Sequence, residues 1–229
     1  MKKLVILTGA GMSAESGIKT FRDSGGLWEQ YPVEEVASID GWYRNPDLVQ
    51  QFYNERRRQL ESAEPNIGHT GLVQLESDFD VHIITQNVDN LHERAGSSKI
   101  LHLHGMLTQA RSSKDPNLII DIGYRDIFPG EKAADGSQLR PNIVWFGEAV
   151  PAMEEAADVA SYADIFAVIG SSLNVYPAAG LIHYVPLLTP VFLIDPKPVK
   201  VPSAHEVQVI MEGASKGVEI LVERLRELS

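Results

Sequence analysis

The clearest chemistry in the sequence lies in the stretch GAGMSAESGIKTFRDSGGLW, residues 9–28, which follows the apolar run LVILT. A strand followed by glycines and a helix start presents backbone N–H groups to a phosphate. Gly9 and Gly11 allow the main chain to approach a pyrophosphate, and Ser13 and Ser16 can donate hydroxyl groups or cap the next helix. For this segment alone, a plain strand-to-helix turn is the alternative.

The same stretch departs from the dinucleotide fingerprint of dehydrogenases. That fingerprint, G-x-G-x-x-G, comes with a second strand and an acidic residue about 20 residues later. Here alanine follows Ser13, and no strand precedes Glu29. The chain continues into TFRDSGGLW, a polar loop whose paired glycines allow it to fold over a ligand. We therefore expect a nucleotide cofactor that is enclosed and consumed.

A second polar motif, TQNVDNLHERAG (85–96), begins where a predicted strand ends. The carboxyl edge of an open α/β sheet is where ligands bind. Gln86, Asn87 and Asp89 bring three hydrogen-bonding side chains to this edge. Helix capping explains Asp89 by itself, and explains all three together less well.

Two histidines in ILHLHG supply a candidate base. His102 and His104 are two residues apart, so both point to the same face of a strand. A neutral imidazole can accept a proton from a sugar hydroxyl near pH 7. His104 stands at the end of the strand, whereas His102 fits a core histidine with satisfied hydrogen bonds. Zinc binding by the pair lacks a third ligand at a recognisable spacing.

Two later motifs offer further contact edges. GSSLNVYPAAGL (170–181) repeats the pattern of strand, Gly-Ser-Ser and helix, so Gly170, Ser171 and Ser172 are predicted to contact ribose or phosphate. RPNIVWFGEAVP (140–151) is an apolar, strand-like segment with a proline near each end. Such an edge can accept an extended peptide by strand addition.

Composition narrows the partners. The 229 residues carry a formal net charge of −11, which repels phosphate backbones, so we expect no nucleic acid partner and a weak attraction for basic protein tails. There is no cysteine, which excludes disulfides, cysteine-ligated zinc and a thiol nucleophile. The apolar run near the N-terminus is too short for an export signal, and no window reaches the about 20 apolar residues of a membrane span. We expect a cytoplasmic protein with no membrane partner.

Apolar runs at 4–8, 81–85, 165–170 and 191–195 predict buried parallel strands, and 100–104 is a fifth candidate. Long stretches with helical periodicity separate them. The alternation predicts an α/β fold with a Rossmann-like, doubly wound parallel sheet.

Two regions break this alternation. Residues 45–63 predict a helix with Asn45 as its cap, and residues 108–141 show no sustained period. We expect them to build a smaller inserted domain, with a helical module at 29–64 and a zinc-free module at 108–141. The Rossmann-like domain would then comprise residues 1–28, 65–107 and 142–229.

Taken together, the motifs GAGMSAESGIKTFR, TQNVDNLHERAG, LHLHG, RPNIVWFGE and GSSLNVYPAAGL resemble the ordered signature of the sirtuins, NAD-dependent protein-lysine deacylases. The resemblance runs from residue 4 to the C-terminus. It is strongest to the bacterial branch that carries the class III pattern, a tyrosine and an arginine in the helical insertion. In FYNERR these are Tyr53 and Arg56.

The resemblance implies NAD as co-substrate and proteins or peptides bearing acyl-lysine as partners. It implies that nicotinamide leaves, that the acyl-lysine oxygen attacks the ribose, and that His104 acts as base on the ribose hydroxyls, with Asn87 as a second catalytic residue. The products would be free lysine, nicotinamide and acyl-ADP-ribose. The implied cofactor contacts are Gly9, Ala10, Gly11, Ser13, Ala14, Gly17, Thr20, Phe21, Arg22, Trp28, Gln86, Asn87, Asp89, Gly170, Ser171, Ser172, Asp195 and Ala214. The implied substrate contacts are Tyr53, Arg56, Val144, Phe146, Gly147, Glu148 and Val175.

The choice of acyl group depends on Tyr53 and Arg56. Positions i and i+3 share a helix face, so the phenol and the guanidinium can converge on one carboxylate. With the resemblance, this favours succinyl-, malonyl- or glutaryl-lysine, with acetyl-lysine as a further substrate. The alternative is that the run of arginines from 56 to 58 is solvated, or paired with Glu55 and Glu61.

Most sirtuins hold the small domain together with a four-cysteine zinc site, which the corresponding segment of this chain lacks. We expect no structural zinc. Burial of apolar side chains would have to replace it, and the candidates are Leu118, Ile119, Ile120, Ile122, Tyr124, Ile127 and Phe128.

Two functions compete with deacylation. One is a module that binds NAD or acyl-lysine without turnover, and the other is a sirtuin-fold protein ADP-ribosyltransferase, which makes no acyl-ADP-ribose. We expect the chain to be a monomer.

Overall fold

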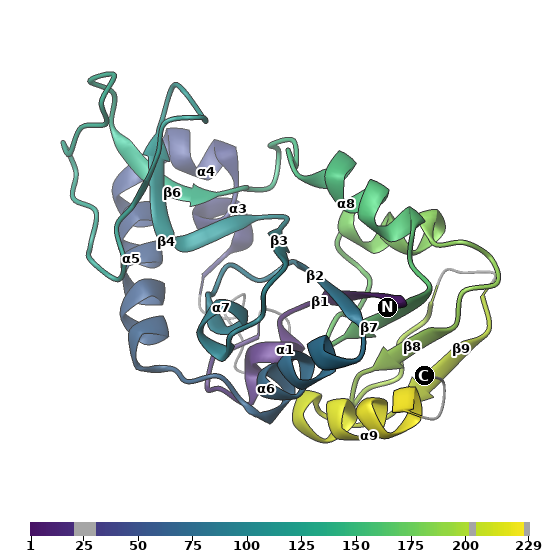
Figure 1. Ribbon diagram of the computed structural model, residues 1–229. Coiled ribbons are helices and arrows are strands. Elements are labelled where there is room, and N and C mark those ends of the chain that lie inside the picture. Colours follow the sequence, from purple (N-terminus) through teal and green to yellow (C-terminus); the bar gives the residue numbers. More distant parts are fainter. Residues whose placement is uncertain (21–30, 202–204, 227–229) are drawn as a thin grey trace.

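The computed structural model describes residues 1–20, 31–201 and 205–226. These residues form two lobes, each built on its own β-sheet (Figure 1). The larger lobe holds a six-stranded sheet in the order β3-β2-β1-β7-β8-β9, with every neighbouring pair parallel. The smaller lobe holds a three-stranded antiparallel sheet in the order β5-β4-β6. The predicted α/β fold with a Rossmann-like sheet is confirmed.

All five predicted strands are present. The six strands are β1 (Lys3–Thr8), β2 (Asp80–Thr85), β3 (Ile100–His102), β7 (Ile165–Ile169), β8 (Val191–Ile194) and β9 (Val207–Ile210). The sequence analysis did not predict β9, because this edge strand is only partly buried and carries a glutamine. Strand order reverses between β1 and β7, and open α/β sheets bind ligands in the crevice outside the carboxyl ends of the strands at such a point.

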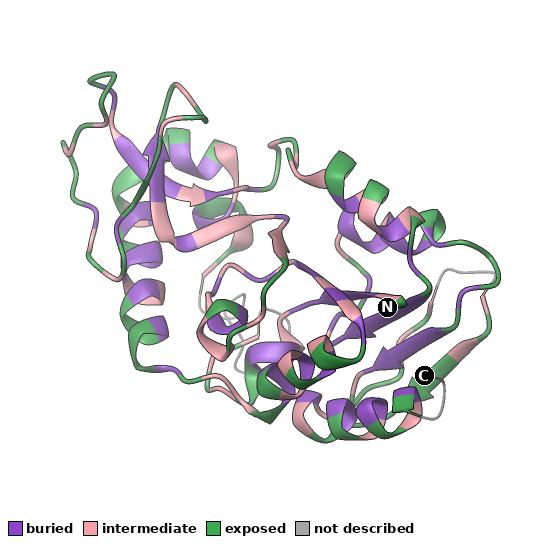
Figure 2. Ribbon diagram, in the orientation of Figure 1, coloured by how far each residue is buried: buried purple, intermediate pink, exposed green. Residues whose placement is uncertain are grey.

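Helices cover both faces of the larger sheet (Figure 1). Alternate residues of β1 face opposite sides: Leu4 and Ile6 pack with α6 (Ile67–Gln74), η1 (Leu75–Ser77) and α9 (Ala214–Arg226). Val5 and Leu7 pack with α8 (Met153–Ser161) and η2 (Ala178–Tyr184). Burial on both faces explains why these strands are almost continuously hydrophobic, and Figure 2 shows their buried central stretches.

The smaller lobe contains α3 (Val33–Val36), α4 (Ile39–Arg44), α5 (Pro46–Ser62), β4 (Gly105–Ser112), β5 (Ile119–Asp121) and β6 (Leu139–Ile143). The helix predicted over 45–63 is confirmed as α5. Asn45 caps it by accepting a hydrogen bond from the Leu48 N–H at 3.2 Å, and Pro46 occupies its first turn. The predicted domain boundaries after residue 107 and before residue 142 fall within β4 and β6.

The expected apolar burial in the zinc-free module is wrong for three of its residues. Ile127 and Ile122 are buried, but Ile119, Ile120 and Phe128 are 46%, 45% and 62% exposed. Strand β5 is an edge strand, and all three of its residues are exposed. The buried apolar cluster of this module comprises Ala110, Ile122, Ile127 and Leu139.

Polar side chains of α5 also hold the module. Gln50 donates to the Leu139 carbonyl at 2.7 Å, and Asn54 donates to the Ile127 carbonyl at 2.9 Å. Arg57 is fully buried and donates to the carbonyls of Arg125 and Leu107. Each bond satisfies a backbone acceptor: Leu107 lies in β4 and Leu139 in β6, whereas Arg125 and Ile127 lie in the loop between β5 and β6.

A second polar cluster closes the module at its far end. The Ser112 hydroxyl donates to the Asp135 carboxylate at 2.6 Å and lies 2.7 Å from the Ser137 hydroxyl. Ser137 donates to the other Asp135 oxygen through its hydroxyl and its N–H. The cluster links the end of β4 to the turn before β6, and no group of three or more potential metal-ligating residues occurs among the described residues.

In the parts of the chain that the structure covers, no helix is long and apolar enough to cross a membrane.

Candidate functional site

Glycines bring two loops into close contact at the crevice between β1 and β7. A Cβ atom on Gly9 would lie 2.7 Å from the Gly170 carbonyl oxygen, and one on Gly11 would lie 2.7 Å from the Gly170 Cα. Gly170 itself has a φ of +61°, and its carbonyl accepts the Gly11 N–H at 2.9 Å. Gly9 and Gly11 are therefore needed for the close packing of the two loops, in addition to any contact with a ligand. The sequence pattern alone could not distinguish these two reasons for glycine. The short helix α1 (Gly11–Ala14) follows.

Side chains from the end of β2 line the same crevice. The Asn87 amide donates to the Gly9 carbonyl at 3.0 Å and to the Ser13 hydroxyl at 3.1 Å. Ser13 in turn donates to Asp89 at 2.9 Å. The other Asp89 oxygen accepts the N–H of Leu91, the first residue of α7 (Leu91–Ala95), so the capping role is also present. Burial raises the pKa of the Asp89 carboxyl.

Gln86 connects the loop after β2 to the loop after β7. Its amide donates to the Ser171 hydroxyl at 2.9 Å, which joins the loop after β2 to the loop after β7. Ser172 follows as an exposed residue. The structure therefore brings Gly9, Gly11, Gln86, Gly170 and Ser171 together, as the motifs predicted.

His104 is held in the orientation that a general base needs. Its Nδ1 lies 3.0 Å from the Gln86 carbonyl oxygen, which can only accept, so Nδ1 carries the proton. In the neutral ring, Nε2 is then the free acceptor. Burial lowers the pKa of His104, which keeps the ring neutral near pH 7.

His102 has a structural role. Its Nδ1 lies 3.1 Å from the Asn87 carbonyl oxygen, and its Nε2 lies 2.7 Å from the Glu93 carboxylate. Both ring nitrogens are occupied, which agrees with the interpretation of His102 as a satisfied histidine. Together the two rings fix the backbone of residues 86 and 87.

Buried residues that were not predicted as site residues hold the Asn87 backbone in place. The Thr85 hydroxyl accepts the Asn87 N–H at 3.0 Å and the Thr8 hydroxyl at 2.8 Å. His92 Nε2 lies 3.2 Å from the Thr8 hydroxyl. A threonine at the end of each of two neighbouring apolar runs was the signal that could have revealed this pair.

The RPNIVWFGE motif lies at the junction of the two lobes. The Val144 N–H donates to the His104 carbonyl at 2.9 Å, so the motif is attached directly to the histidine segment. Phe146 is half exposed, and Val175 is partly buried on the loop after β7. The Glu148 carboxylate accepts bonds from Arg140, Arg111 and the Trp145 N–H, so its oxygens have partners within the chain. Arg111 and Arg140 were not predicted as site residues.

Tyr53 and Arg56 occupy different environments. The Tyr53 hydroxyl accepts the Trp145 Nε1–H at 3.0 Å, and burial raises the Tyr53 pKa. It retains its own proton for donation. The Arg56 guanidinium lies 5.3 Å from the centre of the Phe52 ring, and its buried Nε has no hydrogen-bond partner among the described residues. Burial lowers the Arg56 pKa, and the negative charge of Glu55 acts in the opposite direction. A partly buried cation with an unsatisfied donor is suited to an anionic ligand.

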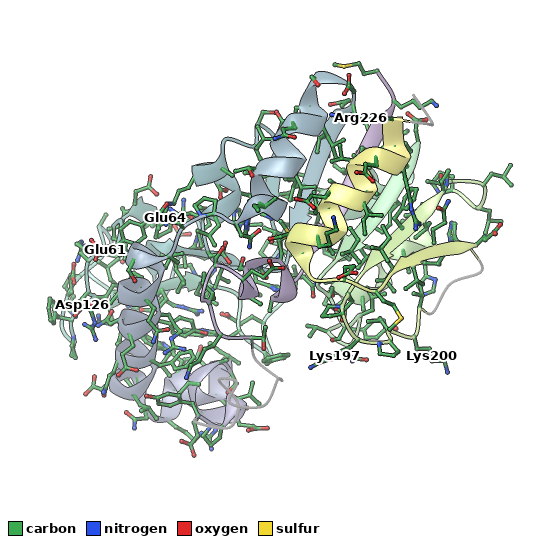
Figure 3. All side chains as sticks on the ribbon, turned by 90° about the horizontal axis from the view of Figure 1, so that it is seen from below. Glu61, Glu64, Asp126, Lys197, Lys200 and Arg226 are labelled. Carbon is green, nitrogen blue, oxygen red and sulfur yellow. The ribbon has the colours of Figure 1, made fainter. Side chains whose placement is uncertain are left out.

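The alternative interpretation of the arginine run is wrong for Arg57, which is fully buried. It holds in part for the other two arginines: Arg58 is 53% exposed, although it pairs with Asp126 at 2.6 Å, and the charge of Glu55 acts on Arg56. Figure 3 shows Glu61 and Asp126 on the same side of the smaller lobe.

The remaining predicted contacts are scattered. Asp195 uses one carboxylate oxygen to accept the Lys197 N–H at 2.9 Å. Ala214 is buried at the start of α9. Residues Phe21, Arg22 and Trp28 lie outside the described residues. Ala10, Ala14, Gly17 and Thr20 lie on or just after the glycine loop.

The crevice fits a dinucleotide by its chemistry. Two loops close together through glycines, and hydroxyl and amide groups of Ser13, Gln86, Asn87 and Ser171 converge there. The site offers neutral donors and acceptors with one buried carboxylate, suited to ribose hydroxyls.

Comparison with known proteins identifies the relatives of this chain. A family profile described as the Sir2 family matches residues 9–177. The chain is 59% identical over 230 residues to an NAD-dependent protein deacylase from Bacteroides thetaiotaomicron, covering 98% of each protein.

Solved structures agree. A Sir2 homologue variant in complex with ADP-ribose superposes with a TM-score of 0.90 at 36% identity, covering 99% of this chain and 93% of that one. A Sir2 variant bound to a deacetylated p53 peptide and 3′-O-acetyl ADP-ribose has a TM-score of 0.81 at 30% identity, covering 96% of this chain and 92% of that one. The chain therefore belongs to the Sir2 family.

Proposed function

We propose that this protein is an NAD-dependent protein-lysine deacylase. The proposal is supported by the deacylase named above, which matches this chain over nearly its whole length, and by solved relatives with ADP-ribose or a deacetylated peptide. It is also supported by the site itself, in which a crevice suited to a dinucleotide ends at a neutral histidine.

The orientation of His104 carries the proposal. Because Nδ1 donates to the Gln86 carbonyl, Nε2 can accept a proton from a hydroxyl in the crevice. NAD, when bound, supplies a ribose whose bond to nicotinamide can be broken in exchange for a bond to the acyl-lysine oxygen. The bound NAD would be held by Gln86, Asn87, Ser13 and Ser171.

The contacts around Asn87 hold the polar groups near His104 in place. Asn87 is buried and fixed by bonds to Gly9 and Ser13, so its amide is immobile before any ligand binds. Preorganised dipoles need no reorganisation during the reaction. Val144 connects the histidine segment to the motif proposed to bind the peptide, so acyl-lysine and base share one rigid support.

For the acyl group, we propose a preference for succinyl- and malonyl-lysine over acetyl-lysine. The support is Arg56 of α5, a partly buried cation whose Nε has no hydrogen-bond partner among the described residues, three positions after Tyr53 on the same helix. A terminal carboxylate on the acyl chain would give the guanidinium a charged acceptor. An acetyl group carries no such charge.

The test is a panel of acetyl-, malonyl- and succinyl-lysine peptides incubated with NAD and analysed by mass spectrometry, with wild type and His104→Ala. We expect free lysine, nicotinamide and acyl-ADP-ribose from wild type, and a strongly reduced yield from the variant. Bound NAD without nicotinamide release would instead identify a non-catalytic binding module. ADP-ribose attached to protein, with no acyl-ADP-ribose, would identify an ADP-ribosyltransferase.

A further inference from the structure

Glu148 lies at the centre of a buried ionic cluster beneath the segment proposed to bind the peptide. One carboxylate oxygen accepts from Arg140 at 2.8 Å and from Arg111 at 3.1 Å. The other accepts from Arg140 at 2.9 Å and from the Trp145 N–H at 2.9 Å. Arg111 and Arg140 are opposite each other on β4 and β6, and both are buried.

The cluster fixes a tight turn. The Glu148 N–H donates to the Trp145 carbonyl at 3.0 Å while the Glu148 side chain accepts the Trp145 N–H, so both backbone groups of Trp145 are held by one residue. Gly147 completes the turn with a φ of +92°. The Arg140 guanidinium stacks 3.5 Å from the centre of the Trp145 ring, which fixes the indole from the other side.

The turn leaves two backbone N–H groups without partners in the described part of the chain. Phe146 uses its N–H and carbonyl to bond Ala37 and Ile39. The N–H groups of Gly147 and Ala149, in contrast, have no hydrogen-bond partner among the described residues. These are the groups that an extended peptide can pair with.

The same cluster is connected by hydrogen bonds to His104 and to Tyr53. The Val144 N–H is bonded to the His104 carbonyl, next to the turn. The indole that Arg140 holds donates to the Tyr53 hydroxyl at 3.0 Å. A change in the Glu148 carboxylate would therefore displace the peptide edge and the indole that bonds Tyr53, while the glycine loops, Gln86 and Asn87 are held by other contacts.

We infer that Glu148 is a positioning residue for the acyl-peptide: with Arg140 and Arg111 it sets the turn at Trp145–Glu148 that aligns the peptide with His104. This inference rests on the proposed function. The sequence resemblance implied that Glu148 contacts the substrate directly. The inference instead assigns its side chain to supporting the backbone edge that would bind the peptide.

The test is steady-state kinetics of Glu148→Gln with an acyl-peptide and NAD each varied in turn. Glutamine keeps one acceptor for Trp145 but removes the charge that binds two arginines. We expect the peptide KM to rise about tenfold or more, with the NAD KM within about twofold of wild type. Glu219→Gln is the matched control, because Glu219 makes an exposed pair with Lys216 on α9, and we expect wild-type constants for it.

Arg111→Gln is the second variant, because it keeps the Arg140–Glu148 pair and is less disruptive to folding. We expect a smaller rise in peptide KM, about two- to fivefold, again without a change in the NAD KM. An unchanged peptide KM in a folded Glu148→Gln protein would show that the inference is wrong. If Glu148→Gln does not fold, an unchanged peptide KM in Arg111→Gln would show the same. Equal rises in both KM values would also overturn it, because that result indicates general loosening. A wild-type protein that forms no nicotinamide would instead refute the proposed function.

Discussion

Replacing Arg56 by methionine should lower activity on succinyl- and malonyl-lysine far more than on acetyl-lysine. Methionine keeps an unbranched apolar side chain and removes the guanidinium that lies over the Phe52 ring and whose Nε has no hydrogen-bond partner in the described part of the chain. A succinyl or malonyl carboxylate therefore loses its proposed partner, whereas the acetyl group has no charge to lose a partner for.

The size of the effect follows from the environment of Arg56. A hydrogen bond to a charged group contributes about 1.5–3 kcal/mol, and each 1.4 kcal/mol is about tenfold, so complete loss would cost about 12- to 140-fold. Arg56 is only partly buried, and solvent weakens its attraction for an anion. We therefore expect kcat/KM for succinyl-lysine to fall about 10- to 30-fold, the lower part of that range, with less than about threefold loss for acetyl-lysine.

The assay measures nicotinamide release from succinyl- and acetyl-lysine peptides of one sequence, at saturating NAD. Arg58→Met is the control, because Arg58 is 53% exposed and paired with Asp126 on the outside of the lobe. Equal losses on both acyl groups in Arg56→Met would refute the assignment of Arg56 to the acyl carboxylate.

Four further results are expected. Since burial lowers the pKa of His104 and the base must be neutral, the acidic limb of kcat/KM should lie below the ordinary histidine value of 6.5, and a limb above pH 7 would contradict this. Gly11→Ala should destabilise the protein by about 1–3 kcal/mol in thermal unfolding and weaken NAD binding, because its Cβ meets the Gly170 backbone, whereas Gly180→Ala, which meets only ordinary contacts, should not. Hydrogen bonds from Ser112 lower the Asp135 pKa to about 2, so Asp135→Asn should lower the melting temperature at pH 7. The difference in melting temperature between wild type and variant should shrink as the pH falls from about 4 toward 2, because the carboxylate becomes protonated. A difference that does not change with pH would count against the cluster. A chelator should leave the melting temperature unchanged, and stoichiometric zinc in purified protein would be the opposing result.

The sequence predicts the larger lobe well, because burial on both faces gives its strands a strong hydrophobic signal. Leu4 to Leu7 are fully buried, and the pattern could only be a central strand. Strand β9 escapes prediction because it lies at the sheet edge, where Gln208 and Val209 are exposed. Its place is set by pairing with β8, a long-range contact that has no local signature.

The smaller lobe is less predictable, because polar residues hold it together. Gln50, Asn54 and Arg57 lie on α5 in a stretch that resembles a solvated helix surface, yet all three are buried. Only the fold reveals that unpaired backbone groups from residues 107–139 meet them. The apolar residues Ile119 and Phe128, which the sequence favours for burial, remain exposed, and Ile119 lies in the edge strand β5.

In the candidate site, the motifs locate the residues and the structure adds their directions. Gln86, Asn87, Asp89 and His104 could be singled out because polar side chains after apolar strands mark a ligand edge. That the Gln86 backbone carbonyl, rather than its side chain, orients His104 could not be predicted, because it depends on the spacing between two parallel strands.

The most direct test of the account is a crystal structure of the protein with NAD and an unreactive acyl-lysine peptide. We expect His104 Nε2 within hydrogen-bonding distance of a ribose hydroxyl, with Nδ1 still bonded to the Gln86 carbonyl. An imidazole ring turned away from the bound sugar, or a dinucleotide held outside the crevice between β1 and β7, would contradict the central claim.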